Sequence, residues 1–592
     1  MRDGGEIENV RYVPGGREVG GALRINMVHR FAVAVLAALM LGIMSLAEAP
    51  SMGMAGATAN ASAQKLSPEG ESVLRKIVDS AHDTDLRWPD FPLYRDEVSM
   101  LYEESEYALV WIRDGRPTPQ ALAISGLLRD ADEKGLVAED YDGPQWEARL
   151  ARLQQPSSDP DLARFDAALT VSAMRYIRAM QIGRVNPKQL GFELDVEGRE
   201  YDLSEFLRTK VVNASDPVAA INEVESPFLG YRRALDALRT YRQKASQDDG
   251  EKLPSVTNPV VAGESYPGVP RLIRLLRLLG DLPASAPVFP DSKVYGGPLV
   301  TAVKAFQGTH GLNPNGHLDA KTVEELNTPL SARVRQIELT LERWRWLPHA
   351  LSSPPVVINL PEFRLRAMDE QGREALQRAV IVGKAYEHQS PVLMADMKYV
   401  VFRPYWEVPA GILQNEIVPR IEKDRNYISA KNFEVVTQDG NLVTDGPISD
   451  EVLARLKASE LRVRQKPGPT NSLGLVKLIF PNEDNVYMHG TDAPGLFSQF
   501  RRDFSHGCIR VQNPGELAAW ALRDNPGWSL ERVEETMNGS KDDVRVNLAH
   551  PIPVLIIYGT AAVDEEGRTH FFEDIYGYDV VLEKALAMVP YP

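Results

Sequence analysis

The spacing at which apolar residues recur along the chain changes near residue 350, and this change constrains the fold more than any other feature. Before it, apolar residues recur at helical spacing, as in Phe165, Leu169, Tyr176 and Met180. After it, short apolar runs separated by turn residues begin at residues 355–360. A chain of 592 residues is also too long for one domain. The sequence therefore predicts a multidomain α+β protein, in which helical domains precede a mainly β domain.

Two helical domains and a connecting helix are predicted before the change. Residues 67–250 form a helical scaffold, in which Gly183 ends a long helix. A polar linker, residues 246–265, leads to a small three-helix domain at 266–330. Asp319 is expected to cap the third of those helices. Residues 331–350 contain the connecting helix, predicted over 331–346 and closed by Pro348.

The mainly β domain is expected over residues 354–592. Residues 369–372 predict a hairpin turn between early strands. A helix is expected at 514–523, with Pro514 in its first position. Further short strands are predicted at 397–403, 476–480, 486–489 and 553–558. About 70 residues of mixed polarity separate the strands near Val400 and Val476, and insertions of this size are often lids over an active site.

The N-terminal extension, residues 1–63, contains a basic residue, an apolar run and small-residue sites in the order typical of an export signal. Arg30 precedes an apolar run, Phe31–Leu46, and the small-residue sites Ala-Glu-Ala and Ala-Ser-Ala follow it. The run is shorter than the ~20 residues of a comfortable membrane span, so a cleaved signal peptide is expected and a retained membrane anchor is the alternative. Met27 would be a more natural start. The net charge of −16 argues against nucleic acid as a partner.

The only cysteine of the chain, Cys508, lies in a distinctive segment. Residues 505–510 read SHGCIR and follow His489-Gly490-Thr491 after thirteen residues. One cysteine in an exported protein cannot form an internal disulfide, and an idle thiol is an oxidation liability there. Thiolates form beside bases or cations and are strong nucleophiles. The two bracketing histidines, His489 and His506, therefore predict an activated cysteine nucleophile.

These motifs resemble a known family. His-Gly-Thr followed by SHGCIR resembles the active-site signature of the L,D-transpeptidases, whose YkuD-type domain crosslinks bacterial peptidoglycan. The whole chain resembles their large periplasmic, YcbB-like branch. Residues 183–187 resemble an element of its scaffold domain, and residues 266–330 resemble a peptidoglycan-binding domain; a helical spacer without glycan contact is the alternative reading. The resemblance further implies a mobile capping subdomain at about 411–470, with matching borders at 404–409 and 467–474.

The resemblance also implies roles for individual residues. Cys508 is the nucleophile, and His489 is chosen as the base that takes its proton. His506 and Gly507 are expected beside the oxyanion, which the backbone N–H groups of residues 507 and 508 would stabilise. Ser505 is expected to orient a histidine through its hydroxyl. The residues expected to bind substrate are Arg510, which offers a planar fork for a carboxylate, together with Gly490, Thr491, Trp406 and Tyr487.

The reaction implied by the resemblance is a transpeptidation without a cofactor. The thiolate attacks the carbonyl at the L-centre of diaminopimelate in a tetrapeptide stem, terminal D-Ala leaves, and a thioester forms. A side-chain amine of a neighbouring stem then completes a 3→3 crosslink in the periplasm. The alternatives are an L,D-carboxypeptidase, an enzyme that joins a protein to the wall, and a wall-binding protein with a dead site. Peptidoglycan stems and glycan are the expected partners, and the membrane is one only if the signal segment is uncleaved.

The motifs of the chain bear on two other chemistries, zinc binding and penicillin-type serine catalysis. His489, His506 and Cys508 could be zinc ligands, completed by Asp492 or Asp503, but the chain has no second cysteine and no HExxH; the expectation is no metal. Penicillin-type serine enzymes require Ser-x-x-Lys together with Lys-Thr-Gly. Ser62–Lys65 fits the first pattern across the end of the predicted export segment, and Lys-Thr-Gly is absent. That class is therefore excluded.

Overall fold

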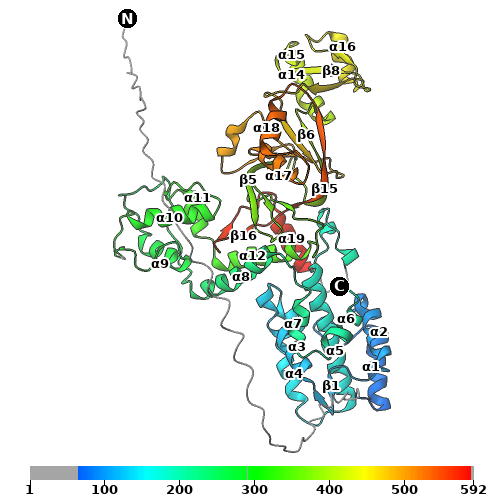
Figure 1. Ribbon diagram of the computed structural model, residues 1–592. Helices are drawn as coiled ribbons and strands as arrows, with labels where there is room; N and C mark the ends of the chain where they lie inside the picture. The colour runs from blue at the N-terminus through cyan, green and yellow to red at the C-terminus, as the bar shows by residue number, and fades with distance from the viewer. Residues whose placement is uncertain (1–63, 200, 290, 589–592) are drawn as a thin grey trace, which may run out of the picture. The chain divides into compact units, whose positions relative to one another are not determined.

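The computed structural model describes residues 64–199, 201–289 and 291–588 (Figure 1). The predicted signal segment, residues 1–63, lies outside them. Helices come first and a β-rich domain follows, which confirms the multidomain α+β prediction. None of the helices in the described ranges is both long and apolar enough to span a membrane.

The first helical region is built around one long buried helix, α5 (Asp159–Ile182). Ser158 and Asp161 form a capping box at its start, and Gly183 ends it with a φ of 82°, as predicted. The other α-helices and strands here are α1 (Pro68–Ser80), α2 (Arg95–Glu104), β1 (Ile112–Arg113), β2 (Arg116–Pro117), α3 (Pro119–Arg129), α4 (Trp146–Arg152), α6 (Leu203–Phe206), α7 (Pro217–Asn222) and α8 (Leu229–Gln247). Short 3-10 turns are η1 (Pro92–Tyr94), η2 (Ala131–Lys134), η3 (Ala138–Tyr141), η4 (Gly143–Gln145), η5 (Pro187–Leu190) and η6 (Glu197–Arg199), and η7 (Leu207–Val211) is a π-helical turn.

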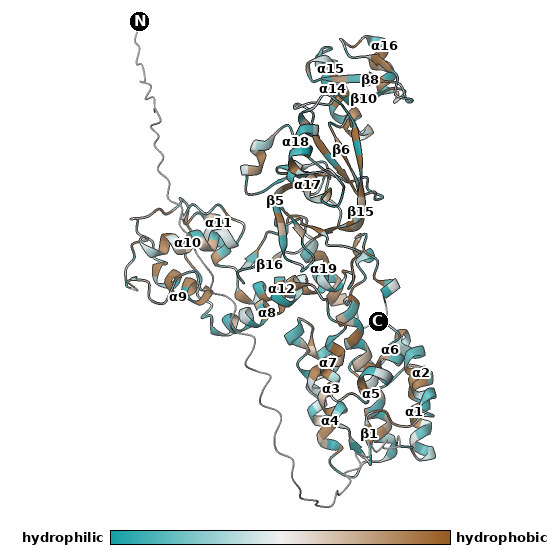
Figure 2. Cartoon of the chain, viewed as in Figure 1, coloured by the Kyte–Doolittle hydropathy of each residue, from teal (hydrophilic) through white to brown (hydrophobic). Residues whose placement is uncertain are grey.

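Three short helices with a core of their own follow: α9 (Val269–Leu279), α10 (Pro298–Thr309) and α11 (Ala320–Leu326). The apolar residues of α9 appear brown in Figure 2. The Asp319 side chain accepts the N–H of Thr322 at 2.7 Å, so its predicted role as the cap of α11 is confirmed. The connecting helix α12 (Leu330–Arg345) lies within one residue of the predicted ends.

The C-terminal domain contains a nine-stranded sheet in the order β13-β5-β14-β12-β11-β6-β15-β3-β4. β4 also pairs with β5, so the sheet closes on itself. Its strands are β3 (Val356–Asn359), β4 (Arg364–Met368), β5 (Glu374–Gly383), β6 (Leu393–Phe402), β11 (Val476–Ile479), β12 (Met488–His489), β13 (Asp503–Ser505), β14 (Ile509–Val511) and β15 (Val544–Ile557). Around it lie η9 (Pro494–Ser498), α17 (Pro514–Ala521), α18 (Leu530–Asn538), β16 (Ala561–Val563), β17 (Thr569–Phe571) and α19 (Tyr578–Met588).

Two local predictions in this domain have different outcomes. The turn at 369–372 is confirmed: the Asp369 carboxylate accepts the N–H groups of Gln371 and Arg373, both at 2.9 Å, between β4 and β5. The strand predicted at 553–558 is only the end of β15, which begins at Val544. Pro551 and a register shift between Asn547 and Ile552 interrupt the alternation that would have shown the rest.

The insertion between β6 and β11 carries its own four-stranded sheet, in the order β7-β10-β8-β9. Its elements are β7 (Trp406–Glu407), α13 (Ala410–Ile412), the π-helical turn η8 (Leu413–Ile417), α14 (Val418–Lys423), α15 (Tyr427–Ala430), β8 (Phe433–Val436), β9 (Leu442–Thr444), α16 (Asp450–Lys457) and β10 (Arg462–Gln465). Leu413, Ile421, Phe433 and Val463 belong to a hydrophobic core separate from that of the main sheet. Figure 1 shows these elements in yellow, beyond the ends of β6 and β15.

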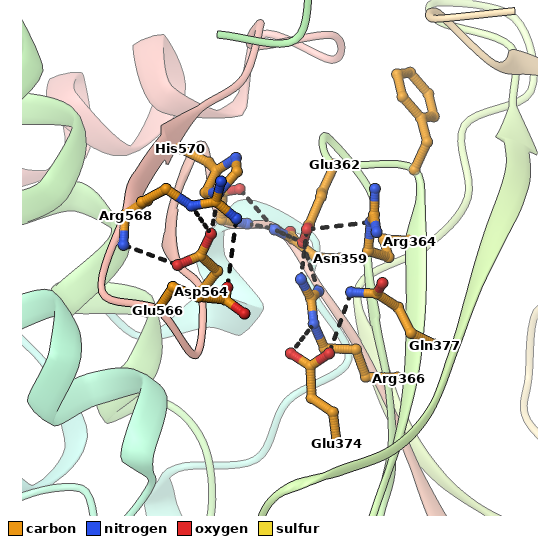
Figure 3. A network of polar contacts seen from close by, with 12 residues as sticks. Asn359, Glu362, Arg364, Arg366, Glu374, Gln377, Asp564, Glu566, Arg568 and His570 are labelled. Atoms are coloured by element: carbon orange, nitrogen blue, oxygen red, sulfur yellow. Dashed lines mark hydrogen bonds and ion pairs between the residues drawn. The ribbon is translucent and has the colours of Figure 1, made fainter. Parts of the chain in front are cut away.

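A polar network fastens the turn between β3 and β4 to β5 (Figure 3). The guanidinium of Arg366 lies between the carboxylates of Glu362 and Glu374 and donates to Glu362 at 2.6 and 2.7 Å. Beside it, Asp564 accepts from Arg568 and lies 2.8 Å from His570. The Arg366 bonds lie within the main sheet and the Asp564 bonds lie within the hairpin of β16 and β17, and the N–H of Glu374 donates to Glu565 of that hairpin at 3.3 Å.

Candidate active site

Two neighbouring strands bring the separated halves of the motif together. β12 and β14 pair in parallel, with Met488 opposite Ile509 and His489 opposite Arg510. The N–H of Ile509 donates to the carbonyl of Tyr487 at 3.0 Å. Cys508 directly precedes β14, so the thiol, His489 and Arg510 come to one place although Cys508 and His489 are nineteen positions apart.

The loop before Cys508 is held by its own serine. The Ser505 hydroxyl donates to the carbonyl of Cys508 at 2.6 Å and accepts the N–H of Gly507 at 3.2 Å. Gly507 has a φ of 108°, a conformation that favours glycine, and its carbonyl accepts from the Ser390 hydroxyl at 2.6 Å. Ser505 thus shapes the loop, whereas the sequence suggested that it orients a histidine. Because the N–H of Gly507 already donates to Ser505, the N–H of Cys508 is the remaining backbone candidate for an oxyanion.

A cavity of about 570 Å³ opens onto these residues. Its walls come from the main sheet and from the insertion between β6 and β11. The predicted site residues that line it are Cys508, His489, His506, Ser505, Arg510, Tyr487 and Trp406. Gly507, Gly490 and Thr491 do not line it. Residues that sequence reasoning missed include Glu416, Arg420, Tyr427, Phe433 and Gln465 of the insertion.

Burial decides the charge state of the thiol. Burial raises the pKa of the Cys508 thiol, and the opposing effects of Tyr487, Lys477 and Arg510 are smaller. The sequence predicted a thiolate activated by its neighbours. In the structure the cost of burying a negative charge exceeds the attraction of the nearby cations, which favours the neutral thiol before substrate binds.

His489 is also neutral. Its side chain is 4% exposed, and burial, followed by the charge of Arg510, lowers its pKa to about 3. A neutral imidazole can accept a proton during the attack, yet it does not hold that proton at rest. Burial therefore disfavours a thiolate–imidazolium pair as the resting state of this site.

His506 has a more open environment. Its Nε2 lies 2.7 Å from Oε1 of Glu416, and its side chain is 40% exposed. The ring centroids of His506 and His388 are 4.8 Å apart. Neither Glu416 nor His388 was singled out from the sequence, because both become neighbours of His506 only through the fold.

Lys477 is a further site residue that the sequence could have revealed. It pairs with His489 across β11 and β12, and its Nζ lies 4.2 Å above the ring of Tyr487. Burial lowers the pKa of Lys477, while the proximity of Cys508 opposes that shift. The available signal was a lysine inside an otherwise apolar strand, residues 476–480.

The two acidic residues considered as zinc ligands, Asp492 and Asp503, have different surroundings. Asp492 lines the cavity, whereas Asp503 forms an ion pair with Arg501 at 2.8 Å. Within the described part of the chain, no group of three or more His, Cys, Asp and Glu side chains is placed to hold a metal ion.

Comparison with protein families assigns three regions. Residues 354–545 match the L,D-transpeptidase catalytic domain. Residues 265–326 match the family described as "Putative peptidoglycan binding domain", and residues 96–238 match the scaffold domain. The chain therefore carries an L,D-transpeptidase catalytic domain together with a scaffold and a peptidoglycan-binding domain, as the motifs predicted.

Individual similar proteins carry names that agree with the matched catalytic-domain family. A protein of Haemophilus influenzae named "Putative L,D-transpeptidase" is 30% identical over 268 residues, which is 44% of this chain and 53% of the relative. The matched chain thus spans about half the length of that relative. An L,D-transpeptidase structure from Xylanimonas cellulosilytica has 17% identity and a TM-score of 0.16, covering 51% of this chain and 100% of its own. One from Stackebrandtia nassauensis has 12% identity and a TM-score of 0.20, covering 51% and 97%; these low scores carry no weight for the fold.

Proposed function

We propose that this chain, which carries an L,D-transpeptidase catalytic domain, is a cysteine-dependent enzyme that forms 3→3 crosslinks between peptidoglycan stems. The observation that carries the proposal is the position of its only cysteine. Cys508 lies in a 570 Å³ cavity that His489 and Arg510 also line. A cavity of this size with a few convergent polar groups is typical of a small-substrate site.

Acylation begins from the neutral thiol. As the Sγ of Cys508 attacks the carbonyl carbon at the L-centre of diaminopimelate, its proton passes to His489. The N–H of Cys508 is the nearest backbone donor for the resulting oxyanion. The tetrahedral intermediate then breaks its C–N bond, D-Ala leaves with the proton, and a thioester remains.

Deacylation reverses these roles. The side-chain amine of a second stem attacks the thioester carbonyl, the C–S bond breaks, and the sulfur recovers a proton from the amine. Arg510 keeps its charge and offers two parallel N–H donors to a stem carboxylate. Trp406 and Tyr487, which line the same cavity, supply apolar walls beside the reacting groups.

The remaining domains fit a cell-wall enzyme. The peptidoglycan-binding match supports peptidoglycan as the partner of the whole chain. Export to the periplasm through the N-terminal segment belongs to the same proposal.

Product analysis tests the proposal. The chain is incubated with tetrapeptide-bearing muropeptides, and the products are separated and sequenced by mass spectrometry. A dimer that has lost one D-Ala and is linked from diaminopimelate to diaminopimelate supports 3→3 crosslinking. Tripeptide without dimer would identify a carboxypeptidase, and a protein–tripeptide adduct formed with added wall protein would identify an attachment enzyme. Cys508→Ala is the matched control and should give none of these.

A further inference from the structure

One carboxylate of the insertion contacts the loop that carries the nucleophile. Oε1 of Glu416 lies 2.7 Å from Nε2 of His506, although 90 positions separate the two residues. An ionised carboxylate only accepts hydrogen bonds, so Nε2 of His506 is the donor when it bonds to the Glu416 carboxylate. The contact therefore fixes both the orientation and the tautomer of an imidazole two residues from Cys508.

The local helix geometry explains why Glu416 faces the cavity. Pro419, at the start of α14, has no N–H to give to the turn before it. Here the N–H of Val418 bonds to the carbonyl of Leu413, the i to i+5 pattern of a π-turn. Leu413 and Ile417 are buried in the core of the insertion, while Glu416 between them lines the cavity.

The second oxygen of this carboxylate is also held. Arg420, one turn further along the helix, donates to Oε2 of Glu416 at 3.2 Å. Its other nitrogen, Nη1, donates to the Tyr427 hydroxyl at 3.0 Å. Glu416 is thus oriented by its own subdomain before it meets His506, with Oε1 left for the histidine.

The loop after β5 also lies beside His506. The ring of His388 is 4.8 Å from that of His506. This loop is itself fixed, because the Ser390 hydroxyl accepts the N–H of Gly383 at 2.9 Å and donates to the carbonyl of Gly507 at 2.6 Å. His506 therefore contacts both the loop after β5 and a helix of the insertion.

The contact contributes little to folding stability. The His506 and Glu416 side chains are 40% and 32% exposed, and ion pairs at such exposure add little. Its value lies in orientation: with Nε2–H donated to Glu416, Nδ1 is the nitrogen left free to accept a hydrogen bond or a proton. A carboxylate that orients a histidine beside a nucleophile is a recurring arrangement in acyl-transfer sites.

We infer that Glu416 is a positioning residue, which holds His506 for the acylation of Cys508 and makes the reaction depend on the docked insertion. This inference rests on the proposed function, since it assigns a role within that reaction. It links the π-turn of the insertion to the chemistry through a single hydrogen bond.

Three variants of the full chain test it: Glu416→Ala, Glu416→Gln and Glu422→Ala. Glu422 lies in the same helix segment, pairs with Lys457 and does not line the cavity, so it is the matched control. The maximal acylation rate and the half-saturating concentration are measured with a carbapenem and with the tetrapeptide. Glu416→Ala should lower the maximal rate about 10- to 100-fold, as a misplaced catalytic group does, with little change in half-saturation. Glu416→Gln still accepts from Nε2 and should stay within about fivefold of the parent rate.

A double-mutant cycle with His506→Ala shows whether Glu416 acts through His506 or supports the structure independently of it. If Glu416 acts through His506, Glu416→Ala adds no further loss in the His506→Ala background. Equal losses in both backgrounds, or a raised half-saturating concentration with an unchanged maximal rate, would overturn the inference and make Glu416 a structural or substrate-binding residue. If the parent and Glu422→Ala are acylated but form no 3→3 dimer, the proposed function fails instead, and the acylation rates still decide the role of Glu416.

Discussion

Alkylation of the single thiol should show that the resting site holds no thiolate–imidazolium pair. The pKa of Cys508 is raised above that of a free thiol, about 8.5, and His489 has a pKa of about 3. Burial disfavours both the thiolate and the imidazolium, so the neutral pair is the favoured resting state of the site. A thiol with such a pKa is less than about 3% ionised at pH 7.

Iodoacetamide, followed by mass spectrometry, measures this directly, because the chain has one cysteine. The second-order rate should rise about 15- to 30-fold from pH 7 to pH 8.5, the range set by a pKa at or above that of a free thiol. The denatured chain, whose thiol titrates normally, provides the reference curve, and Cys508→Ala should not react. A plateau between pH 6 and 8, or an inflection below pH 7, would refute the assignment of a neutral pair.

Three further outcomes are expected. His489→Ala should regain part of its acylation rate only above pH 9, because burial raises the pKa of the thiol; His506→Ala should regain little, and the reverse pattern would exchange their roles. Deleting residues 266–330 should weaken binding to intact sacculi, measured by co-sedimentation, more than turnover of soluble muropeptides; equal losses would make that domain a structural support. Residues 411–470 should exchange amide hydrogens faster than β11 and β12 without ligand and slow down after acylation, whereas equal protection would rule out a gating role.

The sequence predicted the parts of the site that one local segment determines. The SHGCIR segment identified the loop, and apolar spacing identified the domain order, because both depend on neighbouring residues. It could not predict the contact of His506 with Glu416, since that requires a helix 90 positions away to dock on the loop. It also could not predict the direction in which the pKa of the thiol shifts, because burial is a property of the whole fold, and here burial outweighs Lys477 and Arg510. The full extent of β15 was hidden by Pro551 and the register shift beside it.

The low pKa of His489 has a consequence for both halves of the reaction. The attacking thiol and the acceptor ammonium must each lose a proton. A histidine with a pKa of about 3 does not stay protonated near neutral pH, so His489 cannot hold either proton between steps. His489 therefore relays a proton within each step and passes it to the leaving group, D-Ala amine in acylation and sulfur in deacylation. An acceptor stem amine must reach the thioester already neutral, so crosslinking from the acyl-enzyme should rise with pH. If dimer formation from preformed acyl-enzyme were independent of pH between 7 and 9, another group of the site would have to remove the ammonium proton, and His506, oriented by Glu416, would be the residue to test.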